Sequence, residues 1–234
     1  MQRRHVFETS RFDTRTALRL FGVFCAVALL WQTPVVAPLK IFVVLLHEIS
    51  HGAAAVLTGG SIDRIEINAN QGGVCYTLGG NRFAILSAGY LGSMLWGGMI
   101  MLIAARTRLD QALSAVIGLG VLLLALFYVR SLFGFIFCGA FSLAMLVAAF
   151  RFSHDTNELI LKTIGMTSTL YAPLDIFDDV IARTGIGSDA EKLAALTLVP
   201  SFAWGTLWIA LSVAAAIGFL FFAVRRSGAR ASAE

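Results

Sequence analysis

Long apolar runs, separated by short polar or glycine-containing breaks, make up most of the chain. Runs of this kind are typical of transmembrane helices, which need about 20 predominantly apolar residues to cross a bilayer. We therefore expect about six transmembrane helices, over residues 20–31, 39–57, 83–105, 112–128, 131–150 and 201–224.

Residues 61–82 break this pattern. Ile62, Ile65 and Ile67 alternate in part with polar residues, and Val74–Leu78 follows a turn that contains Gly72 and Gly73. This alternation around glycines predicts a short β-hairpin. Lipid cannot satisfy the edges of such a hairpin, so it must lie on the surface or dip into a cavity lined by protein.

The stretch 159–182 is apolar but is interrupted by charged residues and by Pro173, which predicts a broken or partly immersed helix. If this segment crosses fully, the chain has seven spans instead of six. Ser188-Asp189-Ala190-Glu191 fits a capping box and predicts the start of a short helix.

Composition agrees with a membrane protein. The chain is 58% hydrophobic and 14% charged, with a mean hydropathy of +0.80. A soluble domain carries about 25% charged residues, so a soluble enzyme is excluded. We predict an all-α polytopic membrane protein with one membrane-embedded domain at 20–224, the first helix being an uncleaved anchor and not a signal peptide with a cleavage site near Val36-Ala37.

The net charge of +4 is concentrated in basic tails at 1–19 and 225–234. This placement indicates topology and contact with anionic lipid, and not nucleic-acid binding. It predicts a multi-pass protein of the plasma or inner membrane with a cytoplasmic N-terminus. The cysteines, Cys25, Cys75 and Cys138, are too far apart for a CxxC pair and indicate neither a disulfide framework nor a cysteine-rich zinc site.

His47-Glu48-Ile49-Ser50-His51 is an H-E-x-x-H motif in the middle of the second expected span. Residues four apart share one helix face, so both imidazoles can meet one ion, and two imidazole nitrogens suit Zn²⁺. Glu48 lies beside that ion, where it can accept a proton from bound water. The alternative interpretation is that these are polar helix-packing residues. Ionisable groups at this depth are costly, which favours a functional site.

The third ligand must come from elsewhere in the chain. Asp175 lies in an apolar segment beside Pro173, which can break the helix and turn the carboxylate inward. Two histidines and one aspartate leave a fourth position open, as a catalytic zinc site requires. Asp178 and Asp179 are the fallback ligands or would support the ligands without binding the ion, or all three aspartates form one wet helix face. His5 and His154 are expected at the surface.

These features resemble the site-2 protease family of intramembrane zinc metalloproteases, over about residues 39–105 and 165–182. In that family a re-entrant β-hairpin follows H-E-x-x-H. The next helix opens with Gly-Pro-x-x-Asn, here Gly89-Tyr90-Leu91-Gly92-Ser93, and a later broken helix carries Leu-Asp-Gly, here Leu174-Asp175-Ile176. Ser93 and Ile176 depart from the family pattern, and we expect no PDZ domain.

The resemblance implies an intramembrane zinc endopeptidase that cleaves transmembrane protein substrates within the lipid bilayer. A substrate segment would unwind and pair with the hairpin edge. We expect substrate contacts at Val74 and Tyr76 in the hairpin and at Gly89 and Ser93 in the following helix. The alternatives are a non-proteolytic membrane scaffold or chaperone that keeps zinc as structure, which Ser93 and Ile176 favour, and a small transporter, which no internal repeat supports.

Overall fold

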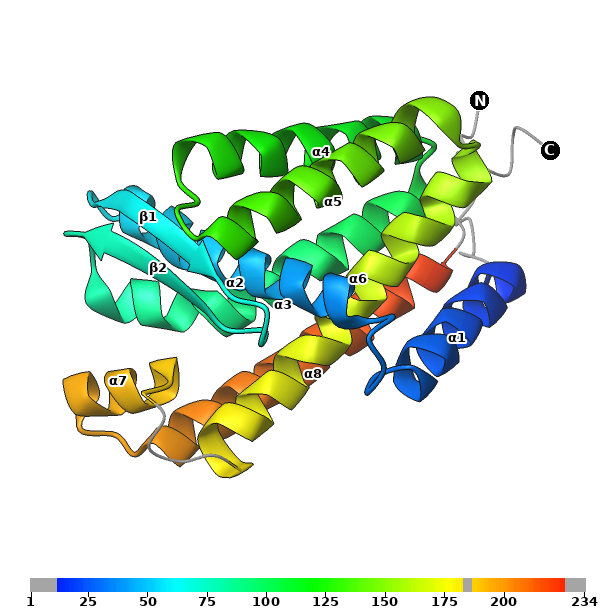
Figure 1. The fold of residues 1–234 in the computed structure, drawn as a ribbon. Helices are drawn as coiled ribbons and strands as arrows, with labels where there is room; N and C mark the ends of the chain where they lie inside the picture. The colour runs from blue at the N-terminus through cyan, green and yellow to red at the C-terminus, as the bar shows by residue number, and fades with distance from the viewer. Residues whose placement is uncertain (1–11, 183–186, 226–234) are drawn as a thin grey trace, which may run out of the picture.

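The computed structural model describes residues 12–182 and 187–225, so most of both predicted basic tails lies outside the described residues. Helices dominate the described chain, with one small antiparallel sheet (Figure 1). The elements are α1 (Thr14–Leu29), α2 (Ala37–Leu57), β1 (Ser61–Ile67), β2 (Gly73–Leu78), α3 (Arg82–Arg106), α4 (Asp110–Phe127), α5 (Leu132–Arg151), α6 (His154–Phe177), the π-helical turn η1 (Asp178–Ala182), α7 (Asp189–Thr197) and α8 (Ser201–Val224).

Helix α2 lies at the centre of the bundle. It packs on α3 and on both hairpin strands, while α4 and α5 form an antiparallel pair and α6 crosses the bundle beside α3 and α8 (Figure 1). Phe42 and Leu45 of α2 are almost fully buried, and the Phe42 ring stacks on Phe141 of α5 at 4.3 Å between centroids. The helix that carries H-E-x-x-H is therefore enclosed by protein on most of its surface.

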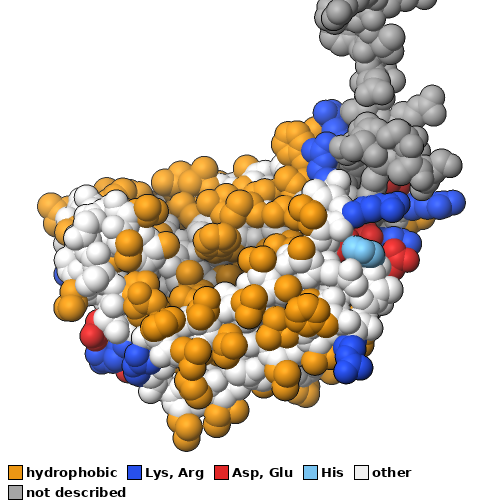
Figure 2. Space-filling view, turned by 90° about the horizontal axis from the view of Figure 1, so that it is seen from above, with side chains coloured by type: hydrophobic (Ala, Val, Ile, Leu, Met, Phe, Trp, Pro, Cys, Tyr) orange, Lys and Arg blue, Asp and Glu red, His pale blue; other side chains and the backbone are white. Residues whose placement is uncertain are grey.

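The structure confirms an all-α polytopic membrane protein. Five helices of the described chain, α2, α3, α4, α5 and α8, are long and apolar enough to cross a membrane. Figure 2 shows apolar side chains spread over one face of the bundle, with charged side chains gathered toward its ends. Five of the six expected spans are found. The first, α1, has 16 residues and is too short.

Helix α6 has 24 residues, enough to span a bilayer, but it is not among the helices that are apolar enough to cross a membrane. Its buried Lys162 bonds to Glu158 one turn earlier, so both charges are paired inside the bundle. The predicted break at Pro173 is not found: α6 continues through Pro173 to Phe177 and widens into η1 only at Asp178.

The two ends of the described chain meet. The Asp13 N–H donates to the carbonyl of Val224 at 2.8 Å, and Phe12 bridges to Arg225. The start of α1 and the end of α8 therefore lie at the same end of the bundle, as Figure 1 also shows. This arrangement favours an even number of membrane crossings and agrees with six spans if α6 supplies the sixth.

The predicted β-hairpin at 61–82 is present, with β1 and β2 antiparallel and Ile65 opposite Cys75. The outer edge of β1 is occupied by the connection between α4 and α5. The Ile65 N–H donates to the Tyr128 carbonyl at 2.8 Å, and the Arg130 N–H donates to the Ile65 carbonyl at 3.0 Å. Ser131 Oγ accepts from the Ile67 N–H and donates to its carbonyl. This leaves β2 as the free edge of the sheet.

Candidate metal centre

The two motif histidines meet on one face of α2, as their spacing predicts. Their ring centroids are 4.7 Å apart, and His51 is buried while His47 is half-buried. The helix rise brings residues four apart almost one above the other. Both Nε2 atoms therefore face the same point in a cavity.

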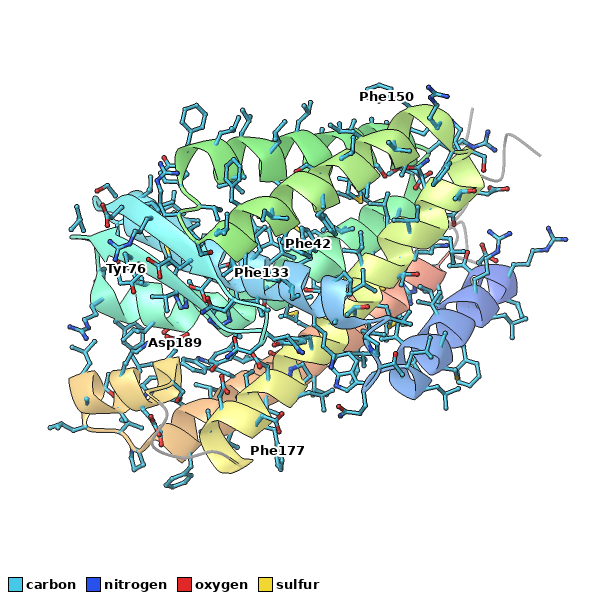
Figure 3. All side chains as sticks on the ribbon, viewed as in Figure 1. Phe42, Tyr76, Phe133, Phe150, Phe177 and Asp189 are labelled. Atoms are coloured by element: carbon cyan, nitrogen blue, oxygen red, sulfur yellow. The ribbon has the colours of Figure 1, made fainter. Side chains whose placement is uncertain are left out.

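Asp189, and not Asp175, completes a group of three ligand atoms with the histidines. Its Oδ2 lies 3.0 Å from Nε2 of His47 and 3.0 Å from Nε2 of His51. Among the described residues, this is the group of histidine and carboxylate atoms close enough together to hold one metal ion. The aspartate comes from the start of α7, which lies below the hairpin and α3 (Figure 3).

Local sequence fixes Asp189 at this position. Ser188 and Glu191 form the predicted capping box, and Gly187 before it has a φ of +75°. Ala190 and Leu193 are fully buried against α3 and α8, so the short helix is held by its apolar face. Burial alone would raise the pKa of Asp189, but the His51 and His47 rings outweigh it and hold the pKa well below its usual range.

Hydrogen bonding fixes the tautomer of His51. Its Nδ1 lies 2.6 Å from the carbonyl oxygen of Ile85 in α3. A carbonyl can only accept, so Nδ1 carries the proton, and in the neutral imidazole the Nε2 lone pair is then available to a metal ion. A partner of this kind on the second ring nitrogen is typical of metal-binding histidines.

Gly89 brings α3 into contact with the histidines. A Cβ at this position would lie 2.4 Å from Nε2 of His47 and 2.6 Å from Nε2 of His51. A side chain would therefore occupy the space in front of both nitrogens. Gly89 therefore lies directly beside the ligand atoms, and its contact with a substrate stays a prediction.

The donor set fits zinc. Ligands at about 2.0–2.1 Å from a tetrahedral Zn²⁺ are about 3.3 Å from one another, close to the two observed separations of 3.0 Å. Two imidazoles and one carboxylate are also the three protein ligands of a catalytic zinc site with an open fourth position. His47, His51 and Asp189 would hold the ion.

Glu48 lies between this group and the hairpin. Its side chain is buried, and a Cβ at Gly73 would lie 2.7 Å from its Oε1, so only glycine allows β2 to approach this closely. The backbone N–H of Cys75 faces the carboxylate and favours its charged form. Glu48 therefore contacts the strand that bounds the cavity on this side.

The predicted aspartates line the same cavity without joining the ligand group. Asp175 interacts electrostatically with His47, and Asp178 and Asp179 also line the cavity. The helix that carries Asp175 is not broken at Pro173. His154 is exposed at the start of α6, and His5 lies outside the described residues.

The residues predicted to contact a substrate do not all line the cavity. Val74 lines it. Tyr76 does not, because its ring lies under the Arg64 guanidinium on the hairpin, at 3.8 Å. Ser93 is buried between helices, where its hydroxyl donates to the Tyr90 carbonyl and its own carbonyl accepts from Ser168 of α6.

Cys75 is a cavity residue that the sequence did not single out for chemistry. Burial, with a further contribution from the Glu48 charge, raises the pKa of its thiol to about 12. The thiol therefore stays protonated at neutral pH, which does not favour a nucleophilic role for Cys75.

Comparison with known protein families identifies the chain. A family model described as "Peptidase M50B-like" matches residues 20–219. Comparisons with curated proteins and with solved structures return no match. The matched region contains α2, the hairpin, α3 and Asp189. The chain therefore belongs to the Peptidase M50B-like family, and so to the site-2 protease family of intramembrane metalloproteases.

Proposed function

We propose that this protein is an intramembrane zinc endopeptidase that cleaves membrane-spanning segments of other proteins. The observation that carries the proposal is the position of Glu48, which lies next to a zinc-compatible ligand group and also contacts the free edge of the hairpin. A general base and a surface for an extended peptide thus meet at one point. The proposal includes the predicted cytoplasmic N-terminus in a plasma or inner membrane.

The hydrogen-bond pattern of the hairpin supports peptide binding at β2. Ile65 directs its N–H and carbonyl to the α4–α5 connection, so it does not exchange hydrogen bonds with Cys75 opposite. The N–H and carbonyl of Cys75 therefore point to the other edge, and the N–H faces Glu48. An added strand would lie along this edge, next to Glu48.

The cavity has room for such a strand. Its volume is about 1020 Å³, at the upper end of the range for ligand sites. It extends from the hairpin past the histidines to Trp31 and Tyr171. A peptide backbone on β2 would have its carbonyl groups beside the ligand group, with side chains directed toward both ends of the cavity.

Each residue then has a defined part in hydrolysis. When bound, zinc supplies a Lewis acid that polarises the peptide carbonyl and lowers the pKa of the attacking water towards about 7. Glu48 accepts the proton of that water and delivers it to the leaving amine nitrogen. The Ile85 carbonyl orients the His51 ring, and the capped start of α7 positions Asp189.

The scaffold alternative loses the sequence features that favoured it. Ser93 is buried in helix packing, and Ile176 is fully buried in the cluster that also contains Tyr90 and Trp208. Neither residue lines the cavity. Their departure from the family pattern therefore changes helix contacts, and not the groups that face a substrate.

The direct test of the proposed function is cleavage by the purified protein of a membrane-spanning substrate in the same proteoliposomes. We expect products cut within the membrane segment, located by mass spectrometry. Chelation should abolish cleavage because it removes the Lewis acid, and added Zn²⁺ should restore it. Intact substrate under zinc-replete conditions, across several membrane-spanning sequences, would contradict the proposal.

Strand addition makes a prediction at Cys75. Cys75→Pro removes the outward N–H and should lower cleavage at least about 10-fold, because proline offers neither a donor to an added strand nor the N–H that faces Glu48. Zinc content should stay at one per chain, since no ligand changes. Cys75→Ala is the matched control, because it keeps the N–H and removes only the thiol. Equal cleavage by the proline and alanine variants would show that the substrate does not use this edge.

A further inference from the structure

Tyr90 in α3 forms a hydrogen bond that no feature of the sequence predicts. Its hydroxyl donates to Oδ2 of Asp179 in η1 at 2.8 Å, and the residue is only 2% exposed. A buried hydroxyl that donates to a carboxylate forms one of the stronger hydrogen bonds in proteins, because the acceptor is charged. The bond ties η1, directly after α6, to the helix that covers the histidines.

The ring of Tyr90 packs directly on a metal ligand. Its centroid lies 4.7 Å from that of His47, with the ring planes at 81° in an edge-to-face arrangement. The preceding residue, Gly89, faces both Nε2 atoms. Any rotation of the Tyr90 ring would therefore move or release the imidazole of His47.

The same ring also reaches the helix that supplies the third ligand. Tyr90 belongs to a buried cluster with Trp208 of α8 and with Ala190 and Leu193 of α7. Its centroid is 5.4 Å from the Trp208 ring, and Ala190 directly follows Asp189. Tyr90 thus packs against a histidine of α2 on one side and is part of the core that seats Asp189 on the other.

We propose that Tyr90 and Asp179 form a positioning pair, in which the hydroxyl–carboxylate bond locks the Tyr90 ring and the ring holds His47 in register with Asp189. The inference rests on the proposed zinc site. Neither residue belongs to the ligand group; each acts through the placement of the ligands. The sequence analysis offered Asp179 as a fallback ligand or as a residue that supports the ligands, and this proposal gives it the second role.

The expected effect follows from the behaviour of groups that orient metal ligands. Losing such a group typically costs about 10–100-fold in metal affinity or activity. Tyr90→Phe keeps the ring and removes only the hydroxyl, so we expect zinc affinity to fall by about 10-fold or more. Asp179→Ala should give a similar loss, while Asp179→Asn should restore much of it because the amide oxygen can still accept from Tyr90.

The experiment measures zinc dissociation constants of the purified full-length variants by competition with a chromophoric chelator. The visible absorption spectrum of the Co²⁺-loaded protein then reports the coordination geometry independently of activity. Tyr171→Phe is the matched control, since it removes a hydroxyl from the same cavity but from a ring that packs on Trp31. The double variant Tyr90→Phe/Asp179→Ala should be no weaker than the weaker single variant.

The outcomes separate the inference from the function on which it rests. Wild-type protein that binds no zinc would overturn the proposed site itself. Zinc binding by wild type with an unchanged dissociation constant and Co²⁺ spectrum in Tyr90→Phe would overturn the positioning pair alone, even if thermal stability falls. Additive losses in the double variant would also overturn it, because they would show that the two residues act independently.

Discussion

Replacing Asp189 with alanine is expected to lower zinc affinity by more than about 100-fold. Loss of a group that only orients a ligand costs about 10–100-fold, and loss of a ligand should exceed that. The Asp189 carboxylate lies next to both histidines, with Oδ2 at 3.0 Å from each Nε2. Without it, two imidazoles remain, which is too few protein ligands for a catalytic zinc site.

Two matched variants make this result specific. Asp175→Ala and Asp178→Ala remove carboxylates from the same cavity wall and should change zinc affinity much less. Lys192→Ala removes the partner of Asp189 Oδ1 at 3.6 Å and tests whether that exposed ion pair matters. Zinc content after dialysis against a chelator of known affinity is the measurement. A larger loss of zinc affinity in Asp175→Ala than in Asp189→Ala would show that the third ligand is Asp175 of α6 and not Asp189.

The histidine part of the site could be predicted from sequence because it is local. His47 and His51 lie one turn apart on any α-helix, so their spacing alone places both nitrogens at one point. The hairpin could be predicted for the same reason, since alternation at Ile62–Ile67 and the glycine turn are short-range signals. Both features were therefore found at the expected residues.

The proposed third ligand could not be predicted in this way because it is not local. Asp189 lies 142 residues after His47, and its capping box reveals only that a helix begins there. What seats α7 on the site is the buried pair Ala190 and Leu193, a weak apolar face on a short helix. The local sequence favours Asp175 as the third ligand, because Pro173 predicts a break in its helix. In the structure α6 is unbroken, and Ala172 and Ile176 on either side of Pro173 are buried.

The roles of Tyr76 and Ser93 were also beyond local reasoning. Alternation along a strand places Val74 and Tyr76 on one face, but it does not reveal that Arg64 covers the Tyr76 ring. Small residues in α3 predicted close helix packing, and Ser93 shows that close packing also takes it out of the cavity. A small-residue motif therefore identifies the helix that approaches the site, but not which of its residues face the cavity.

Replacing Glu48 with glutamine is expected to abolish cleavage while leaving the fold and the zinc content unchanged. Glutamine is almost the same size, so it still fits against Gly73, and its amide oxygen can still face the Cys75 N–H. It cannot accept a proton from water, and loss of a general base is worth about 10²–10⁴-fold in rate. His47→Ala is the contrasting variant, because it should lose zinc and cleavage together.

The same substitution separates the protease from the scaffold. Cleavage of a membrane-spanning substrate and zinc content are measured in parallel, and growth or signalling is compared in cells that carry each variant. A scaffold that keeps zinc as structure needs the ligands but not the base, so Glu48→Gln would be silent and the histidine variants would be unstable. Full function of Glu48→Gln in cells, with intact zinc, would therefore refute proteolysis while retaining the metal centre. Loss of function with zinc retained would show that the variant lacks the general base. Glu48 has the position for this role, because it contacts the hairpin edge and lines the cavity of the metal ligands.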